Sequence, residues 1–333
     1  MKWIRISPQC TGRVYTGEVG QARVVNLQWQ CDMETMPAGK EQRVFRARYK
    51  IDTPGLVSHI TQRAAGKEPL FLDDRDYLTM LGLFKESSEK FSLDYYALCL
   101  MPNHTHALLR PKERNLAVAM RSIFSRYAAK FNRRYERRGH LFGGRYRQSV
   151  CLDDTYLLTA SVYIHLNPVR AGLVDDAAEY RWTSSALYCR DNPKESFINP
   201  GPVLELVDND GQNARRKYRR ILKKARGEEP ENALEHQGAI ERFCIRLSEI
   251  FPGLFKRLGG KKDAGQDYTP SLLELSELEQ RLKDLGNTRA RNEESKMVRK
   301  YIVEQLIARG YKKTEIAEKL GISLRNVYYI LNS

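Results

Sequence analysis

The stretch LCLMPNHTHALLRP, residues 98–111, places two histidines two positions apart, just after an apolar run. In a β-strand successive side chains point to opposite faces, so His104 and His106 would share one face and Thr105 would point away. Imidazole nitrogens bind divalent metals, but two ligands are too few for a metal site. Taken alone, the pair favours a structural role, because short motifs often arise by chance.

The residues around this stretch alternate between strand and helix patterns. Residues 93–101 are rich in aromatic and apolar residues, as in a strand, and residues 106–110 continue that strand or pair with it. Upstream, residues 56–63 alternate like a half-buried strand. Residues 73–91 then have a helical pattern that begins with acidic residues.

The same alternation continues downstream. A long helix is expected at residues 115–138, and a Gly pair then leads into a strand at residues 143–152. Residues 153–173 form a further helix pattern, with Asp153 or Asp154 as N-cap and Pro168 near its end. The order is that of a ferredoxin-like βαββαβ unit with one extra helix, so we expect an α+β fold.

We expect four regions along the chain. They are an N-terminal extension without a clear pattern (1–45), a catalytic domain (46–190), a basic and helical connecting region (191–290) and a mainly helical end with a helix-turn-helix (291–333). Within the connecting region, residues 227–235 are expected to form a surface junction. Residues 259–267 have the composition of a linker.

Composition favours a nucleic-acid partner. The 333 residues carry a formal net charge of +15, although a solvated basic surface remains the alternative. The six cysteines are scattered, which fits structural thiols in a reducing cytoplasm; they are Cys10, Cys31, Cys99, Cys151, Cys189 and Cys244. No apolar run is long enough to cross a bilayer and the N-terminus lacks a signal-peptide core, so we expect a cytoplasmic protein without a membrane partner.

A second candidate pair lies in YIHLNPVR, residues 163–170. Tyr163 and Asn167 are four residues apart and would lie on one face of a helix. An Asn carbonyl can complete a metal's ligand shell, and a tyrosine can act as a nucleophile. The alternative for Asn167 is that it ends the helix, since Asn-Pro is common at turns and helix boundaries.

Together these motifs resemble the HUH-type single-tyrosine transposases, particularly the REP-associated tyrosine transposase group with its IS200-like domain. The matching stretches are MPNHTHALLRP, the basic helix, GGRYRQS, YIHLNPVRAGLV and the opening segment ARYKIDTPGLVSHITQRA. The resemblance covers about residues 46–190 and keeps the expected motif order. It implies that His104 and His106 are paired metal ligands, Tyr163 is the nucleophile and Asn167, where some relatives have Gln, is the third ligand.

The resemblance also implies a reaction. One Mg²⁺ or Mn²⁺ ion would assist cleavage of single-stranded DNA at hairpin-forming repeats, through a 5′-phosphotyrosine and a free 3′-hydroxyl. It implies a bacterial, nucleoid-associated protein, acting as a monomer or homodimer. A nickase with the same chemistry is a close alternative. A catalytically idle, domesticated relative that acts as a repressor or architectural protein is the alternative from another class.

Other side chains compete for these roles. Among the tyrosines at 127, 135, 146 and 156, Tyr156 is the credible rival, since it lies two helical turns before Tyr163. Ala160, however, occupies the position where a ligand would follow Tyr156. His165 would point elsewhere around the helix. His59 could approach the site or fill the sheet face, and filling is the favoured interpretation.

Basic residues concentrate between residues 110 and 150, where twelve Lys or Arg accompany two Glu. With interleaved aromatic residues they are typical of single-strand binding. The alternative is an amphipathic helix whose aromatic residues belong to the core, and this is the favoured interpretation for Phe124 and Phe131. The candidate DNA contacts here are Arg121, Arg126, Lys130, Arg133, Arg134, Arg145 and Arg147. A second basic cluster at residues 215–226 is either another DNA-binding surface or a charged helix face.

Residues 311–331 fit a helix-turn-helix, with Gly321 at the turn and Ser323 as N-cap of the second helix. Arg325 and Asn326 would then face the major groove of duplex DNA, a second partner. A plain helical hairpin is the alternative.

Overall fold

The computed structural model describes residues 50–66, 68–151, 153–227, 239–260, 293–308 and 311–332. All of them belong to the larger of two compact units of the chain, Arg43–Ser333. The N-terminal extension expected at residues 1–45 lies outside the described residues, as do most of the junction at 227–235 and of the linker at 259–267. Within the described part of the chain, no helix is both long and apolar enough to cross a membrane.

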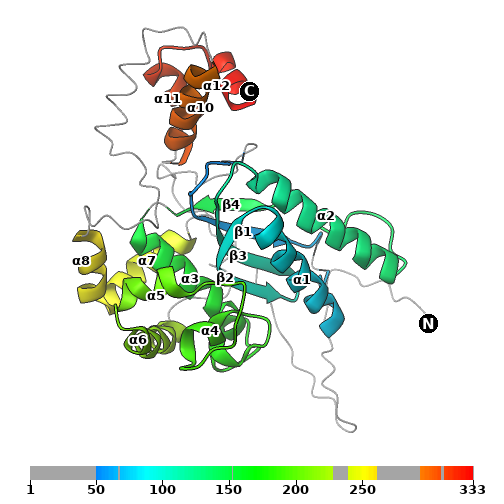
Figure 1. Ribbon diagram of the computed structural model, residues 1–333, viewed down its shortest axis with the longest axis vertical. Helices are drawn as coiled ribbons and strands as arrows, with labels where there is room; N and C mark the ends of the chain where they lie inside the picture. Colours follow the sequence, from blue (N-terminus) through cyan, green and yellow to red (C-terminus); the bar gives the residue numbers. More distant parts are fainter. Residues whose placement is uncertain are drawn as a thin grey trace, which may run out of the picture. The chain divides into compact units, whose positions relative to one another are not determined.

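A four-stranded sheet lies at the centre of an arrangement of mixed helix and strand (Figure 1). Its strands are β1 (Ser58–Arg63), β2 (Leu93–Met101), β3 (His104–Pro111) and β4 (Arg147–Val150). They lie in the order β2-β3-β1-β4, with every neighbouring pair antiparallel. Helix α1 (Asp74–Lys90) connects β1 to β2, and α2 (Leu116–Arg134) connects β3 to β4. The predicted alternation of strands and helices is therefore confirmed, and β3 is a hairpin partner of β2.

Local sequence explains where the helices begin. Asp73 caps α1 by accepting a hydrogen bond from the backbone N–H of Asp76. Asp153 caps α3 (Asp154–Arg170) in the same way, through the N–H of Tyr156 at 2.7 Å. Each cap satisfies a donor that the first helical turn leaves unpaired. Helix α3 runs through Pro168 to Arg170, so Asn167 does not end it.

The helices predicted at residues 115–138 and 153–173 and the strand predicted at residues 143–152 were too long, and α3 ends at Arg170. Helix α2 ends at Arg134 rather than at residue 138, because Glu136 adopts a φ of 51°, outside the helical region. The strand predicted at residues 143–152 is reduced to β4, Arg147–Val150. Gly144 has a φ of 152°, which interrupts the extended chain before the ladder begins.

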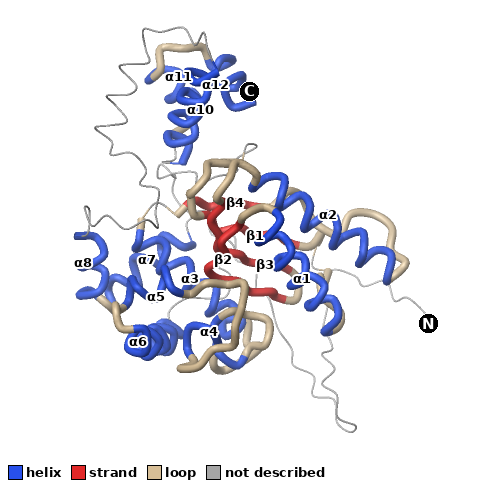
Figure 2. Tube along the Cα trace, viewed as in Figure 1, coloured by secondary structure: helices blue, strands red, loops and turns tan. Residues whose placement is uncertain are grey.

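Helices cover the sheet on both faces, with α1 and α2 on one and α3 on the other (Figure 2). The residues at alternate positions of each strand divide between these faces. The first face is apolar, and its core includes Ile60, Leu98, Leu100, Ala107, Leu109, Phe84, Phe124 and Phe131. The interpretation of Phe124 and Phe131 as core residues is thus confirmed. Ala97, Cys99, Met101 and Leu108 face α3.

The helices that follow α3 share its core. They are η1 (Ala177–Glu179), α4 (Ser185–Cys189), α5 (Gly201–Val207), α6 (Gly211–Lys224), η2 (Ala225–Gly227), α7 (Ala239–Ile250) and α8 (Pro252–Gly260). Helix α6 buries Ala214, Tyr218, Ile221 and Leu222. Three basic residues of the cluster at residues 215–226 form ion pairs: Lys217 with Asp208, Arg219 with Asp176 and Arg226 with Asp175. These pairs favour the charged helix face over a second DNA grip.

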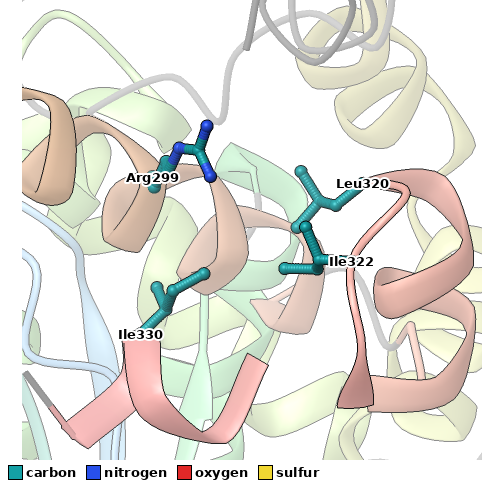
Figure 3. A pocket seen from close by; sticks show the side chains of 4 residues that line it. All are labelled: Arg299, Leu320, Ile322 and Ile330. Carbon is teal, nitrogen blue, oxygen red and sulfur yellow. The ribbon is translucent and has the colours of Figure 1, made fainter. Parts of the chain in front are cut away.

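Three helices end the chain: α10 (Glu293–Ala308), α11 (Lys313–Lys319) and α12 (Leu324–Asn332). Gly321 takes a φ of 61° between the last two, and Ser323 Oγ accepts from the N–H of Asn326 at 3.2 Å. Their apolar sides meet at Ile316 and Val327, both fully buried. Arg299, Leu320, Ile322 and Ile330 surround a small pocket between these helices (Figure 3). On α10, the buried Glu304 accepts hydrogen bonds from Thr53 and Arg114.

Candidate active site

The two histidines of the hairpin lie on the α3 face of the sheet. In the β-ladder His104 is opposite Arg63, and His106 is opposite Thr61. Side chains of directly opposite residues share a face, so these four belong together. The two imidazole centroids are 4.8 Å apart, with nearly perpendicular ring planes. The prediction that His104 and His106 project together is confirmed.

In both imidazoles the Nδ1 atom is engaged. Nδ1 of His104 lies 2.6 Å from Oδ1 of Asn103, and Nδ1 of His106 lies 2.9 Å from Nε2 of His59. Nε2 of His106 is buried and has no hydrogen-bond partner. An unpaired buried nitrogen is costly in an ordinary core, whereas metal-ligating histidines characteristically use one ring nitrogen for the metal and the other for a protein partner. The histidine pair therefore fits a metal.

His59, at first interpreted as filler, lies directly against this pair. Its ring stacks on that of His106 with centroids 5.1 Å apart, and Thr61 Oγ1 lies within 3.4 Å of both. Burial, and then the electrostatic influence of His104, lowers the pKa of His59 to about 4 and the pKa of His106 well below its ordinary value. Both rings are therefore neutral near pH 7, the form in which imidazole binds metals.

Helix α3 brings Tyr163 to the same place. The centroid of its ring lies 6.0 Å from that of His106 and 6.1 Å from that of His59. Phe243 of α7 and the guanidinium of Arg170 lie 6.2 and 5.6 Å from the same ring. These neighbours leave Tyr163 only 2% exposed. DNA can therefore reach the phenol only after the groups around it move.

Asn167 lies one turn beyond Tyr163, as the spacing predicted. Its side-chain N–H donates to the Tyr163 backbone carbonyl at 3.0 Å, and the residue is 6% exposed. The amide oxygen is then the atom through which this side chain could bind a metal. Among the described residues, no group of three or more His, Cys, Asp or Glu is placed to hold a metal ion.

The rival residues have other surroundings. Tyr127 donates to the Leu70 carbonyl on the opposite face of the sheet, and Tyr135 donates to Asp76. His165 is fully buried and bonds to Tyr218 and Ser184, so it points away from the site as expected. Tyr156 packs at the edge of the α3 core, in the first turn of the helix.

The predicted DNA contacts separate into three groups. Those on α2 lie on the sheet face opposite the histidines; Arg121, Lys130 and Arg133 are exposed there, while Arg126 pairs with Glu86 and Arg134 with Asp73 and Asp76. Arg145 and Arg147 are exposed near β4, and Arg147 is opposite Thr61, on the histidine face. Arg325 and Asn326 are exposed on α12.

Lys50 lies close enough to Arg145 and Arg147 to feel their charge, and the sequence analysis missed this residue. Its ammonium lies 4.9 Å from the centroid of the Tyr146 ring. Burial, and then repulsion from Arg145 and Arg147, lowers the pKa of Lys50 to about 8. Positive groups that crowd together in this way favour an anion nearby. The run of basic residues just before β1 was the only signal in the sequence.

Residues 52–167 match the family model described as Transposase IS200 like. This segment is similar to the IS200-like transposase domains. The resemblance drawn from the motifs is therefore confirmed for the residues that contain His104, His106, Tyr163 and Asn167.

Known proteins similar to parts of this chain carry related names. A Haemophilus influenzae protein, provisionally named a REP-associated tyrosine transposase, is 26% identical over 112 residues, which are 30% of this chain. The match spans 64% of that relative's length. A solved structure of a REP-associated tyrosine transposase bound to a REP hairpin covers 46% of this chain and 93% of its own, at 14% identity and a TM-score of 0.39.

Proposed function

We propose that this chain is a metal-dependent transposase that cleaves and rejoins single-stranded DNA at hairpin-forming repeats, as a REP-associated tyrosine transposase. The observation that carries the proposal is the position of the Tyr163 ring, 6.0 Å from that of His106 across the interface of α3 and the sheet. A tyrosine next to an imidazole with an unpaired buried nitrogen supports nucleophilic attack beside a metal.

The reaction proposed for Tyr163 stores the energy of the broken bond. The phenol oxygen attacks the phosphorus, the bond to the 3′ oxygen breaks, and the DNA 5′ end stays attached as a phosphotyrosine. The phenol proton leaves to a nearby base or to solvent, and the departing 3′ oxygen takes up a proton. In the reverse step a 3′-hydroxyl attacks the phosphotyrosine and releases Tyr163. No external energy source is needed.

His104, His106 and Asn167 are the proposed holders of one Mg²⁺ or Mn²⁺ ion. When bound, such an ion would polarise the scissile phosphate and favour its in-line geometry. The residues would contribute two imidazole nitrogens and one amide oxygen as ligands. Imidazole suits Mn²⁺ better than Mg²⁺ in softness, whereas the oxygen donor suits both.

The remaining regions have proposed roles of their own. Residues 46–190 form the catalytic domain, whose four strands with α1 and α2 are its ferredoxin-like unit. Residues 191–290 connect it to residues 291–333, a helix-turn-helix in which Arg325 and Asn326 on α12 contact duplex DNA. Arg145 and Arg147 would hold the backbone of the single strand beside the histidines.

The test is adduct formation by the full chain. Labelled single-stranded hairpin DNA from the flanks of its own gene is incubated with Mn²⁺, Mg²⁺ or EDTA, and covalent products are resolved on a denaturing gel. We expect a metal-dependent adduct that Tyr163→Phe abolishes and Tyr156→Phe retains. Tight binding without any adduct, unaffected by EDTA, would instead point to a domesticated DNA-binding protein.

A further inference from the structure

We infer that His59 is a positioning residue for His106, fixing the ring so that its Nε2 is the atom presented to a divalent metal. The inference rests on the proposed function, in which His106 is a ligand. It concerns a residue on a different strand, β1, that contributes no metal ligand of its own.

Geometry is the first support. His59 Nε2 and His106 Nδ1 are 2.9 Å apart, a distance at which one nitrogen donates to the other. The contact uses the only His106 nitrogen that has a partner, since Nε2 is buried without one. The two rings are 24° from parallel and both side chains are buried, so neighbouring atoms restrict their rotation.

Proton placement is the second support. A neutral imidazole carries one hydrogen, and only the other nitrogen has a lone pair for a metal. If His59 donates, His106 must carry its hydrogen on Nε2 and cannot bind there. If His106 donates from Nδ1 and His59 accepts, Nε2 of His106 is available. Metal binding therefore requires His59 to be the acceptor, with its own hydrogen on Nδ1.

His104 provides an internal contrast. Its Nδ1 faces Oδ1 of Asn103 at 2.6 Å, and a carbonyl oxygen can only accept. The proton of a neutral His104 is thus held on Nδ1 by a fixed acceptor. His106 instead depends on a partner that can adopt either role, and Thr61 Oγ1, 3.3 Å from His106 Nδ1, is the only other group recorded at that atom among the described residues. His59 is therefore the residue through which this ligand can be gained or lost.

The experiment measures Mn²⁺ binding directly, by electron paramagnetic resonance titration of the full chain without DNA. His59→Gln and His59→Asn form a matched pair, because both carry an amide acceptor but only the longer side chain reaches the position of Nε2. We expect Asn to weaken Mn²⁺ binding ten- to a hundredfold and Gln to keep it within about threefold of wild type.

Two controls separate a positioning role from loss of a buried side chain. His165→Gln removes another fully buried imidazole, whose hydrogen-bond partners Tyr218 and Ser184 do not belong to the proposed metal site. It should lower the melting temperature without changing the Mn²⁺ affinity. His104→Ala should lose the binding altogether.

Each outcome has a meaning. Wild-type affinity in both His59→Asn and His59→Gln, with loss in His104→Ala, would overturn the positioning role and leave the proposed metal site intact. Equal weakening in both His59 variants would also overturn it, because the acceptor would then not matter. Mn²⁺ binding that is absent from the wild type, or indifferent to His104, would overturn the metal site and this inference together.

Discussion

The two faces of the central sheet are built from the same four strands and serve different ends. The face toward α1 and α2 is apolar, with Leu98, Leu100 and Ala107 among its residues. The face toward α3 includes the buried histidines His59 and His106, beside Tyr163 of α3. Because strand residues alternate in direction, one strand can supply a core to one face and reactive groups to the other. The apolar core and the residues of the proposed chemistry therefore lie on opposite faces of the same sheet.

The sharpest test of this separation uses two buried tyrosines, one on each face. Tyr163→Phe should abolish the DNA adduct, a loss of more than about 10³-fold, because no other oxygen takes its place. Tyr127→Phe should retain the adduct but reduce stability by about 1–2 kcal/mol, since the Leu70 carbonyl loses its buried donor. Adduct gels and urea denaturation of both variants provide the measurements. Equal effects of the two substitutions on adduct formation would remove the distinction.

The free energy of unfolding should depend more on the apolar face than on the histidine face. Leu98→Ala removes a side chain 1% exposed from the apolar face and should cost about 2–5 kcal/mol. His106→Leu should change the free energy of unfolding by no more than about 1 kcal/mol in the absence of metal, because it removes an unpaired buried nitrogen and fills similar space. His59 Nε2 loses its bond to His106, but Thr61 Oγ1 lies 3.4 Å from it and can take over as partner. Urea unfolding monitored by circular dichroism tests this. A cost for His106→Leu as large as for Leu98→Ala would mean that both faces serve stability.

Single-strand DNA binding should also depend on the face. Arg147→Ala, on the histidine face, should weaken binding about tenfold. The slope of log affinity against log salt concentration should fall by about the amount expected for one phosphate contact. Arg133→Ala, exposed on α2, should have an effect of less than about threefold. Fluorescence anisotropy at several salt concentrations distinguishes them. The reverse ranking would move the DNA path to the α2 side.

The smallest expected effect is a pH dependence at Lys50. With its pKa lowered to about 8, Lys50 loses its charge as the pH rises from 7 to 9, so DNA affinity should fall a few-fold over that range. The free energy of unfolding responds in the opposite direction. Between about pH 8 and 10.5 the Lys50 amine is still protonated in the unfolded chain but has lost its proton in the folded one, so the stability that depends on this group rises with pH over that range. Lys50→Met should flatten the binding profile. An unchanged profile in that variant would assign the dependence to another group.

The sequence allowed prediction of what depends on local spacing. Alternation placed His104 and His106 on one face, and the helical repeat placed Asn167 one turn from Tyr163. The order of strands and helices followed from periodicity alone. The lengths of several elements were wrong, among them those of α2 and β4, next to which Glu136 and Gly144 take positive φ angles.

What remained unpredictable depends on contacts between distant residues. His59 meets His106 because β1 pairs with β3 across 47 positions, and no local period encodes that register. Phe243 covers Tyr163 from a helix 80 positions away. Arg126 and Arg134 were predicted as DNA contacts from charge alone, and only the fold reveals their carboxylate partners on or beside α1.

Pro168, inside α3, has a mechanical consequence. It has no N–H, so the carbonyl of Ile164 lacks its usual helical donor and the turn after Tyr163 is held by one bond fewer. Asn167 immediately precedes this position. The segment that carries the amide is therefore more compliant than the turns before it, which gives it some freedom to bend while the phenol stays anchored in the better-bonded part of the same helix.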